Sequence, residues 1–175
     1  MKKPDQLRKQ AREQHLSGNT KDAIILLTEA ISSDPSNVLV ALDMVQIFLD
    51  INELEQAEAL FNRLPDSAQK SEMGVSIASQ LNFKQLAQNT AGIAVLQVQV
   101  LKSPDNYQAN FDLALCLFAQ HEVEQGMEKL FFIQENNPDF KEGAAKEMIG
   151  LICNMLANTN PKESGVYRRR LANLN

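Results

Sequence analysis

The sequence predicts an all-α fold made of antiparallel helix pairs stacked in a row. The first observation behind this prediction is a period in the prolines: Pro104 and Pro138 are 34 positions apart, and Pro35 and Pro104 are 69 apart, which is two such periods and one residue. Their surroundings are alike, reading Ser-Asp-Pro-Ser-Asn, Ser-Pro-Asp-Asn and Asn-Pro-Asp-Phe. Proline ends the preceding helix, and a neighbouring Ser, Asp or Asn can cap the next one. These segments are therefore predicted to be joints between helix pairs.

The second observation is a small residue at a matching place along the repeats. Counting from the prolines, the positions where paired helices come closest fall on Ala11, Ala57, Ala114 and Gly126. Two helices can approach closely only where one side chain is small, while larger neighbours at helical spacing fill the space around the contact. A period near 34 residues with this arrangement is the pattern of the tetratricopeptide repeat. We therefore expect about four such repeats in a superhelical stack.

The predicted repeats belong to a single domain over residues 1–175. They span roughly 4–37, 38–71, 72–106 and 107–140, and residues 141–175 form capping helices. Within the first pair, Gly18 is expected to end the first helix because glycine tolerates a positive φ. The third repeat has no clear register, since its segment 88–92, Gln-Asn-Thr-Ala-Gly, does not fit the spacing.

The C-terminal region is predicted to be two helices that close the stack. The apolar pattern predicts a helix from Phe140 to Ala157, largely covered by its neighbours, and Pro161 breaks it. A shorter helix from Glu163 to Leu174 follows. Repeat proteins need such an end piece to shield the apolar face of the last repeat.

Charge and hydropathy exclude two classes of function. With 17 basic and 22 acidic residues the net charge is −5, which repels a phosphate backbone, so no nucleic acid partner is expected. The longest apolar stretch, 38–49, contains Asp43 and Gln46, and a membrane span needs roughly 18 to 20 apolar residues. The N-terminus lacks the apolar segment of a secretory signal. We expect a cytoplasmic protein without a membrane segment.

No residue pattern predicts catalysis, a metal site or a cofactor. Cys116 and Cys153 are 37 positions apart without a C-x-x-C motif, and His15 and His121 have no Cys or second His at ligand spacing. Carboxylates such as Glu53 recur on helical faces with no base or nucleophile nearby, and there is no Gly-rich phosphate loop. The chain is therefore expected not to be an enzyme and to need no cofactor.

Two segments add a family resemblance to the repeats. They read Glu-Val-Glu-Gln-Gly-Met-Glu-Lys-Leu at 122–130 and Tyr-Arg-Arg-Arg-Leu at 167–171. With the repeats, they resemble the C-terminal half of the bacterial YbbN, or CnoX, thioredoxin-like chaperone family. In that family a thioredoxin-like domain precedes a tetratricopeptide region, and the protein acts as a chaperone-associated holdase. The resemblance implies that this chain binds proteins: unfolded clients, chaperone machinery, and its own N-terminal thioredoxin-like domain if one is present.

The resemblance also implies a candidate binding face. In tetratricopeptide proteins the first helix of each pair lines the concave face, and in the second and fourth repeats its inward positions are occupied by Leu39, Leu42, Gln46, Leu49, Gln108, Phe111, Leu115 and Phe118. This face would be apolar and could hold an unfolded client or a partner helix. The alternative is that these side chains are core residues, covered by the next helix or by a second copy of the chain. A carboxylate-binding clamp is not expected, because only Arg8 and Arg12 resemble one.

A second candidate site is the basic C-terminal segment Tyr167, Arg168, Arg169 and Arg170. These arginines could dock on an acidic chaperone surface, or they could serve the helix itself by lying near the negative end of its dipole. Two functions therefore stay open for the chain. It is a protein-interaction module of a thioredoxin-like chaperone, or it is a structural scaffold or dimerisation domain that binds no client.

Overall fold

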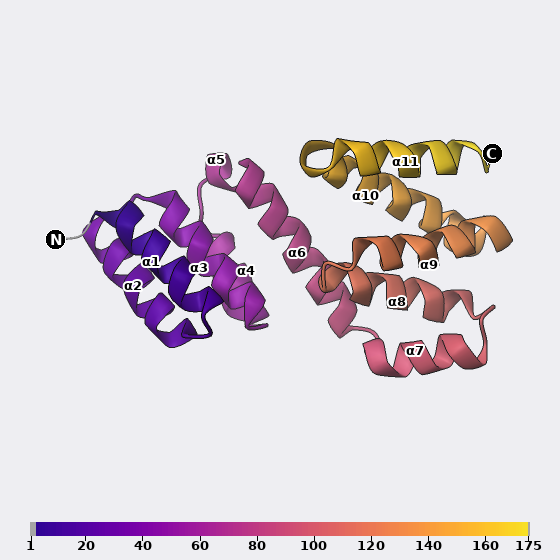
Figure 1. Cartoon of the computed structure of the whole chain (residues 1–175), viewed down its shortest axis with the longest axis horizontal. Helices are drawn as coiled ribbons and strands as arrows, with labels where there is room; N and C mark the ends of the chain where they lie inside the picture. Colours follow the sequence, from indigo (N-terminus) through magenta and orange to yellow (C-terminus); the bar gives the residue numbers. More distant parts are fainter. Residues whose placement is uncertain (1–2, 175) are drawn as a thin grey trace. The chain divides into compact units, whose positions relative to one another are not determined.

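The computed structural model describes residues 3–174, and over that range it is built from α-helices and one short 3-10 helix, with no strand (Figure 1). The predicted all-α architecture of antiparallel helix pairs is confirmed. The chain divides into two compact units, Met1–Asn82 and Phe83–Asn175, where the sequence predicts one domain. The division falls inside α6 because the apolar residues of this helix belong to different cores. Ile77 and Leu81 pack with the first unit, and Phe83 packs with the second.

The first unit contains two complete helix pairs. Its elements are α1 (Pro4–Leu16), α2 (Thr20–Ser33), α3 (Val38–Asp50), α4 (Leu54–Phe61), the short α5 (Asp66–Gln69) and the beginning of α6 (Glu72–Gln88). One apolar cluster joins α1, α2 and α3 and contains Ala11, and a second joins α3, α4 and α6 and contains Ala57. Both alanines are buried, so the small residues lie inside the stack as predicted.

The second unit continues the same arrangement. After the end of α6 it contains α7 (Ile93–Lys102), α8 (Tyr107–Ala119), α9 (Val123–Asn136), the 3-10 helix η1 (Phe140–Glu142), α10 (Ala144–Thr159) and α11 (Pro161–Ala172). Its largest apolar cluster draws on α6, α8, α9, α10 and α11 and is centred on buried residues such as Phe131 and Ile149. The two C-terminal helices therefore extend the core of this unit.

The joints between pairs are held by the predicted asparagine caps. The Asn37 side chain accepts a hydrogen bond from the backbone N–H of Leu39 (3.2 Å) at the start of α3. Asn106 accepts one from the backbone N–H of Ala109 (3.0 Å) at the start of α8. Each bond satisfies a backbone donor that has no partner within the helix. The capping role predicted from the proline-flanking residues is confirmed at both joints.

Three of the turns within pairs share one conformation. Gly18, Asn52 and His121 have φ values of 85°, 62° and 62°. In each turn the next residue's N–H bonds to a carbonyl five residues back, and these bonds measure 2.8 Å, 2.8 Å and 2.9 Å. This is the hydrogen bond that closes a helix with a left-handed residue. The predicted end of the first helix at Gly18 is confirmed, and the turn recurs at equivalent places in the second and fourth pairs.

The third pair keeps the repeat length but moves its turn. Its first helix, α6, has 17 residues where α1, α3 and α8 have 13, and its second helix, α7, has 10 where α2 and α9 have 14. The loop that joins the two helices therefore lies about one helical turn further along the repeat than in the other pairs. Gly92 in this loop is in the left-handed region, with φ 87°. Because α7 is shorter by the same amount, Pro104 keeps its place in the period. This compensation explains why the sequence gives the third repeat no readable register.

Gly126 marks a close approach of two paired helices. An added Cβ at this position in α9 would lie 2.5 Å from Cε1 of the Phe118 ring in α8. Phe118 is buried and also packs on Phe83, with the two ring centroids 5.3 Å apart. The ring therefore has no open space into which it can move.

We predict that Gly126→Ala destabilises the fold by about 1 to 3 kcal/mol through overpacking. This cost should exceed the gain of roughly 1 kcal/mol in helix propensity that alanine has over glycine. Gly150 in α10 provides the matched control, since an added Cβ there meets nothing within 4 Å, and Gly150→Ala should stabilise the protein. Urea unfolding followed by circular dichroism measures both changes. Stabilisation by both substitutions would show that the α8–α9 contact is not tight.

Candidate protein-binding surfaces

Four of the eight predicted concave-face residues lie in the core. Leu42 and Leu49 are fully buried in the cluster that joins α3, α4 and α6. Leu115 and Phe118 are buried in the main cluster of the second unit. These four side chains are covered by neighbouring helices, which is the alternative that the sequence left open. They support the stack and present no surface to a partner.

The other four predicted residues reach solvent, but they differ in what surrounds them. Leu39 and Gln108 are exposed, and Gln46 and Phe111 are half-buried. Gln108 donates a hydrogen bond to Asp112 (2.8 Å) within α8. The two half-buried residues each belong to a larger group of side chains, one in each unit.

In the first unit, Gln46 lines a groove between α1, α3 and α6 in which ion pairs lie beside aliphatic side chains. The groove has a volume of about 300 Å³ and is lined by Arg8, Ala11, Arg12, His15, Leu16, Leu27, Asp43, Gln46, Ile47, Asp50 and Met73. Asp43 is only 8% exposed, and its carboxylate accepts hydrogen bonds from Arg8 (2.6 Å) and Arg12 (3.3 Å). Two guanidinium groups thus neutralise one buried carboxylate, and the only clamp-like residues are engaged within the chain.

Further hydrogen bonds connect the polar residues in and beside this groove. His15 lies within hydrogen-bond distance of Asp50 through Nε2 (2.9 Å) and of Thr20 through Nδ1 (3.0 Å). The side-chain amides of Gln46 and Gln80 pair with each other across α3 and α6 at 2.9 and 3.1 Å. The groove of the first unit thus combines an apolar lining with ion pairs and amide bonds, because charged residues on α1 lie beside charged residues on α3.

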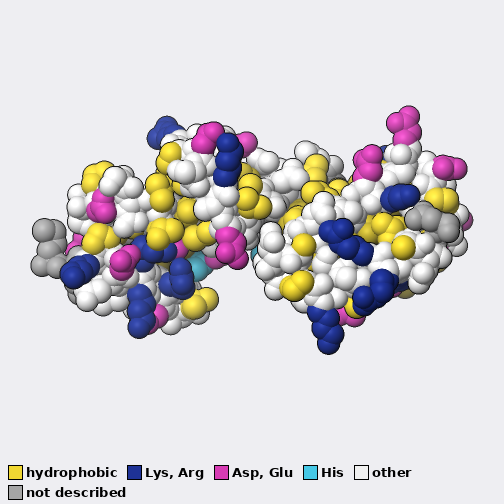
Figure 2. Space-filling model, turned by 90° about the horizontal axis from the view of Figure 1, so that it is seen from above, with side chains coloured by type: hydrophobic (Ala, Val, Ile, Leu, Met, Phe, Trp, Pro, Cys, Tyr) yellow, Lys and Arg dark blue, Asp and Glu magenta, His cyan; other side chains and the backbone are white. Residues whose placement is uncertain are grey.

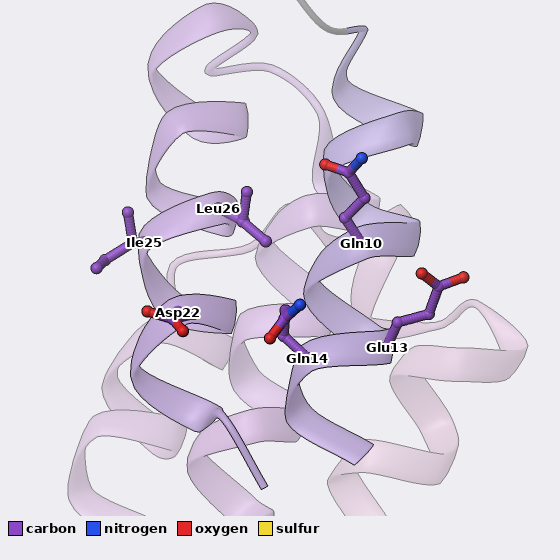
Figure 3. A pocket seen from close by; sticks show the side chains of 6 residues that line it. All are labelled: Gln10, Glu13, Gln14, Asp22, Ile25 and Leu26. Atoms are coloured by element: carbon purple, nitrogen blue, oxygen red, sulfur yellow. The ribbon is translucent and has the colours of Figure 1, made fainter. Parts of the chain in front are cut away.

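A second groove of the first unit lies between α1 and α2 and is shown in Figure 3. Its volume is about 540 Å³, and it is lined by Gln10, Glu13, Gln14, Asp22, Ile25 and Leu26. Leu26 points toward α1, and Ile25 points away from it. The lining residues are amides, carboxylates and aliphatic side chains, with no His, Cys, Ser or Lys among them. A polar outer face is common at the terminal repeat of a stack.

In the second unit, Phe111 belongs to an aromatic cluster formed by Tyr107, Phe111, Phe132 and Phe140. The Phe140 ring lies 5.9 Å from the Phe111 ring and 6.4 Å from the Tyr107 ring, and Tyr107 lies 6.1 Å from Phe132, measured between centroids. All four rings are half-buried. The ammonium group of Lys141 lies 5.8 Å from the Phe111 centroid and 5.7 Å from the Phe140 centroid. The cluster therefore offers partly exposed ring faces beside a surface cation.

An extended joint brings Phe140 and Lys141 to this cluster. The helices α3 and α8 begin three residues after their prolines, whereas α10 begins six residues after Pro138. The added residues form η1, in which Lys141, Glu142 and Gly143 all have left-handed φ values of 45°, 59° and 88°. The predicted start of an α-helix at Phe140 is therefore wrong, because three consecutive residues with positive φ precede α10, which begins at Ala144.

The basic segment at the C-terminus holds α11 in place. Tyr167 is buried against Phe131, with centroids 6.0 Å apart, and its hydroxyl donates to Glu163 (3.0 Å). Burial and that carboxylate raise the pKa of the Tyr167 phenol well above its ordinary value. Arg170 lies over the Phe131 ring, 4.1 Å from its centroid. Tyr167 therefore belongs to the core.

The arginines of this segment also have partners within the unit. Arg170 pairs with Glu128 and with Glu135 (3.2 Å) on α9. Arg168 donates to Asn154 on α10 (2.7 Å). Arg169 is exposed. Three of the four residues predicted for partner docking thus connect α11 to its own unit, and two of the four, Arg168 and Arg169, are exposed.

Apolar side chains also reach the surface elsewhere, as Figure 2 shows for one face of each unit, where they lie among scattered charged residues. On α7, Val95 and Val98 are about half exposed and Leu101 is 84% exposed. A shallow cavity of about 290 Å³ beside them is lined by Gln97, Val100, Leu101, Pro104, Leu113, Leu117, Gln125 and Lys129. Three of the exposed large apolar side chains of the second unit therefore lie on α7.

Comparison with known proteins assigns the family. A profile described as tetratricopeptide repeat matches residues 86–174, about half of the chain, and another with the same description matches residues 15–81. The chain belongs to the tetratricopeptide repeat family. Such repeats are protein–protein interaction modules and are generally not catalytic, so this tetratricopeptide repeat chain is a protein-interaction module.

Two solved structures align along nearly all of the chain. A domain of protein VP0806, of unknown function, from Vibrio parahaemolyticus is 24% identical, with 97% of this chain and 98% of that chain covered and a TM-score of 0.44. The MamA RS-1 ArsTM double mutant is 15% identical, with 99% and 95% covered and a TM-score of 0.43. The comparison with curated proteins gives no match.

Within residues 3–174 the tetratricopeptide repeat chain contains no group of three or more His, Cys, Asp and Glu residues that could hold a metal ion. No helix in this range has the length and apolar character that crossing a bilayer requires. Cys116 and Cys153 are free and buried, and burial raises the pKa of the Cys153 thiol. A thiol that is buried and protonated reacts slowly.

Sequence reasoning identified one member of the aromatic cluster, Phe111, and missed the others. Tyr107 and Phe132 lie on predicted helices, but Phe140, whose ring lies beside those of Tyr107 and Phe111, was predicted to lie inside a helix. One signal could have located it. Gly143 follows Phe140 closely, and glycine near a predicted helix start is typical of a turn.

We predict that Tyr167→Ala destabilises the second unit by about 3 to 5 kcal/mol, the usual cost of deleting a large buried ring. Arg169→Ala should change the free energy of unfolding by no more than about 0.5 kcal/mol, because this side chain is exposed. Thermal unfolding of both variants tests the assignment. A large loss of stability in Arg169→Ala would contradict it.

Proposed function

We propose that this chain is the protein-interaction module of a bacterial, cytoplasmic thioredoxin-like chaperone, and that it holds unfolded clients or folding-machinery partners on exposed apolar and aromatic side chains. The observation that carries the proposal is the aromatic cluster, whose four rings are half-buried on the surface of the second unit. Aromatic side chains bury a large area at low entropic cost and dominate the energetics of many interfaces.

The family part of the proposal rests on the resemblance of segments 122–130 and 167–171 to the thioredoxin-like chaperone family. These two segments lie in α9 and α11 and are joined by the ion pair between Glu128 and Arg170. Residues that are far apart in the sequence thus act as one structural feature, which supports their use as a joint signature. If a thioredoxin-like domain precedes this chain in the natural protein, it would be a further partner.

Phe111→Asp tests the client-binding role. We expect this variant to weaken binding of an unfolded client by about 2 kcal/mol, roughly thirtyfold, as for a buried aromatic anchor of an interface. Light scattering of an aggregating client protein measures the loss of protection. The helical content of the variant, measured by circular dichroism, should be retained.

Leu16→Asp is the matched control for this substitution. Leu16 is 80% exposed and belongs to the first unit, whereas the aromatic cluster belongs to the second. The variant places the same charge on an apolar surface residue and should leave the protection unchanged. Equal losses in the two variants would contradict a specific role for the aromatic cluster.

The second candidate function is a structural scaffold or dimerisation domain that binds no client. The exposed apolar face of α7, with Val95, Val98 and Leu101, favours it, because a second copy of the chain could cover such a face. Multi-angle light scattering separates the two functions. A tight dimer that gives an aggregating client no protection would favour the scaffold.

A further inference from the structure

The aromatic cluster has the chemistry to hold a cation. The Nζ atom of Lys141 lies within 6 Å of two ring centroids, at 5.8 Å from Phe111 and 5.7 Å from Phe140. A cation at this distance is attracted by the negative face of an aromatic ring. Two rings tilted at 50° to each other therefore share one ammonium group. The structure itself shows what kind of group the cluster attracts.

The ammonium group of Lys141, which now lies over the two rings, is held there only by weak contacts. Lys141 is exposed, lies in a turn between two helices, and adopts a left-handed φ of 45°. Non-glycine residues adopt this conformation at a cost, so the joint constrains the backbone of Lys141 and not its exposed ammonium group. A cation–π contact at an exposed site is weak. The ammonium group of another molecule can thus replace that of Lys141 without unfolding a helix.

The charges around the cluster favour a cationic ligand. In the segments that carry Tyr107, Phe111 and Phe140, which are 104–118 and 137–143, the acidic residues are Asp105, Asp112, Asp139 and Glu142, and the one basic residue is Lys141. These five charges give a local net charge of −3. The surrounding field therefore attracts a basic group and repels an acidic one.

We infer that the aromatic cluster is a binding site for a basic side chain, a Lys or Arg of a partner polypeptide, and that Lys141 occupies this site when the partner is absent. The inference rests on the proposed protein-binding function and adds the chemistry of the partner. Phe111 and Phe140 supply the ring faces, and Tyr107 adds a third ring and a hydroxyl group. A partner segment that carries a basic residue next to an apolar one would satisfy both the rings and the acidic surroundings.

An Arg-Gly repeat hexapeptide is a suitable probe, with a norleucine-Gly hexapeptide of the same length as its uncharged control. The chain has no Trp and two Tyr residues. In a Tyr167→Phe background, the fluorescence of Tyr107 therefore reports on the cluster directly. We expect the Arg peptide to bind at least about fivefold more tightly than the norleucine peptide at low salt, as expected for a cation on aromatic faces.

Lys141→Asn tests the role of the internal cation. Asparagine tolerates the left-handed backbone better than most residues, so the turn is kept while the charge is lost. We expect the Arg peptide to bind this variant about two- to fivefold more tightly than the parent, because it no longer displaces a competitor. Lys162→Asn makes the same change of charge on α11 and should leave binding as it was. Equal affinities of Lys141→Asn and the parent would overturn the inference.

Phe140→Leu tests whether the ring itself is needed. Leucine keeps an apolar side chain and removes the ring, so binding of the Arg peptide should fall at least about threefold, whereas the norleucine peptide should bind the variant and the parent alike. Unchanged binding of the Arg peptide, or equal binding of the Arg and norleucine peptides, would overturn the inference and leave the client-binding role standing. If the parent chain itself gives an aggregating client no protection, the proposed function is overturned instead. If Phe140→Leu fails to fold, Lys141→Asn still decides the matter.

Discussion

The structure depends on the close approach of paired helices at small residues. The backbone of α9 comes so near to α8 at Gly126 that an added Cβ would touch the Phe118 ring, and Ala11 and Ala57 are buried in the corresponding clusters of the first unit. A single helix pair cannot bury its apolar face alone, so each pair must pack on the next. Accordingly, the cluster of the first pair includes Val40 from α3. The same contact that brings two helices together thus also creates the surface on which the next pair packs.

The local features of this fold could be predicted from the sequence because each depends on a few neighbouring residues. Asn37 and Asn106 cap helices as their places beside proline indicate, and Gly18 takes the left-handed turn. The third repeat could not be predicted in the same way. Its longer α6 and shorter α7 compensate each other, so the period of the prolines hides the shift of the turn. The division of the chain inside α6 could not be predicted either, because it depends on which core each apolar residue of α6 joins and no change in composition marks it.

The candidate surfaces were harder to predict than the fold. A repeat period indicates which residues point inward, but it does not indicate which of them a neighbouring helix covers. Leu42 and Leu49 pack with Ile77 and Leu81 of α6, which are distant in the sequence. They are therefore buried and cannot form part of a binding face. The partner of Arg8 and Arg12 is likewise distant, because Asp43 belongs to the next pair. Contacts of this kind depend on how pairs stack, which no local pattern encodes.

The two units hold their surface cations in different ways, and this difference bears on which one a partner can use. In the first unit, Arg8 and Arg12 are bound to a carboxylate that is 8% exposed. An acidic partner that took these arginines would leave Asp43 buried and unpaired, which typically costs several kcal/mol. In the second unit, Lys141 rests on half-exposed rings and is itself exposed, so its displacement leaves no buried charge. Exchange with a partner is therefore much less costly at the aromatic cluster than at the Arg8–Asp43–Arg12 ion pairs of the first unit.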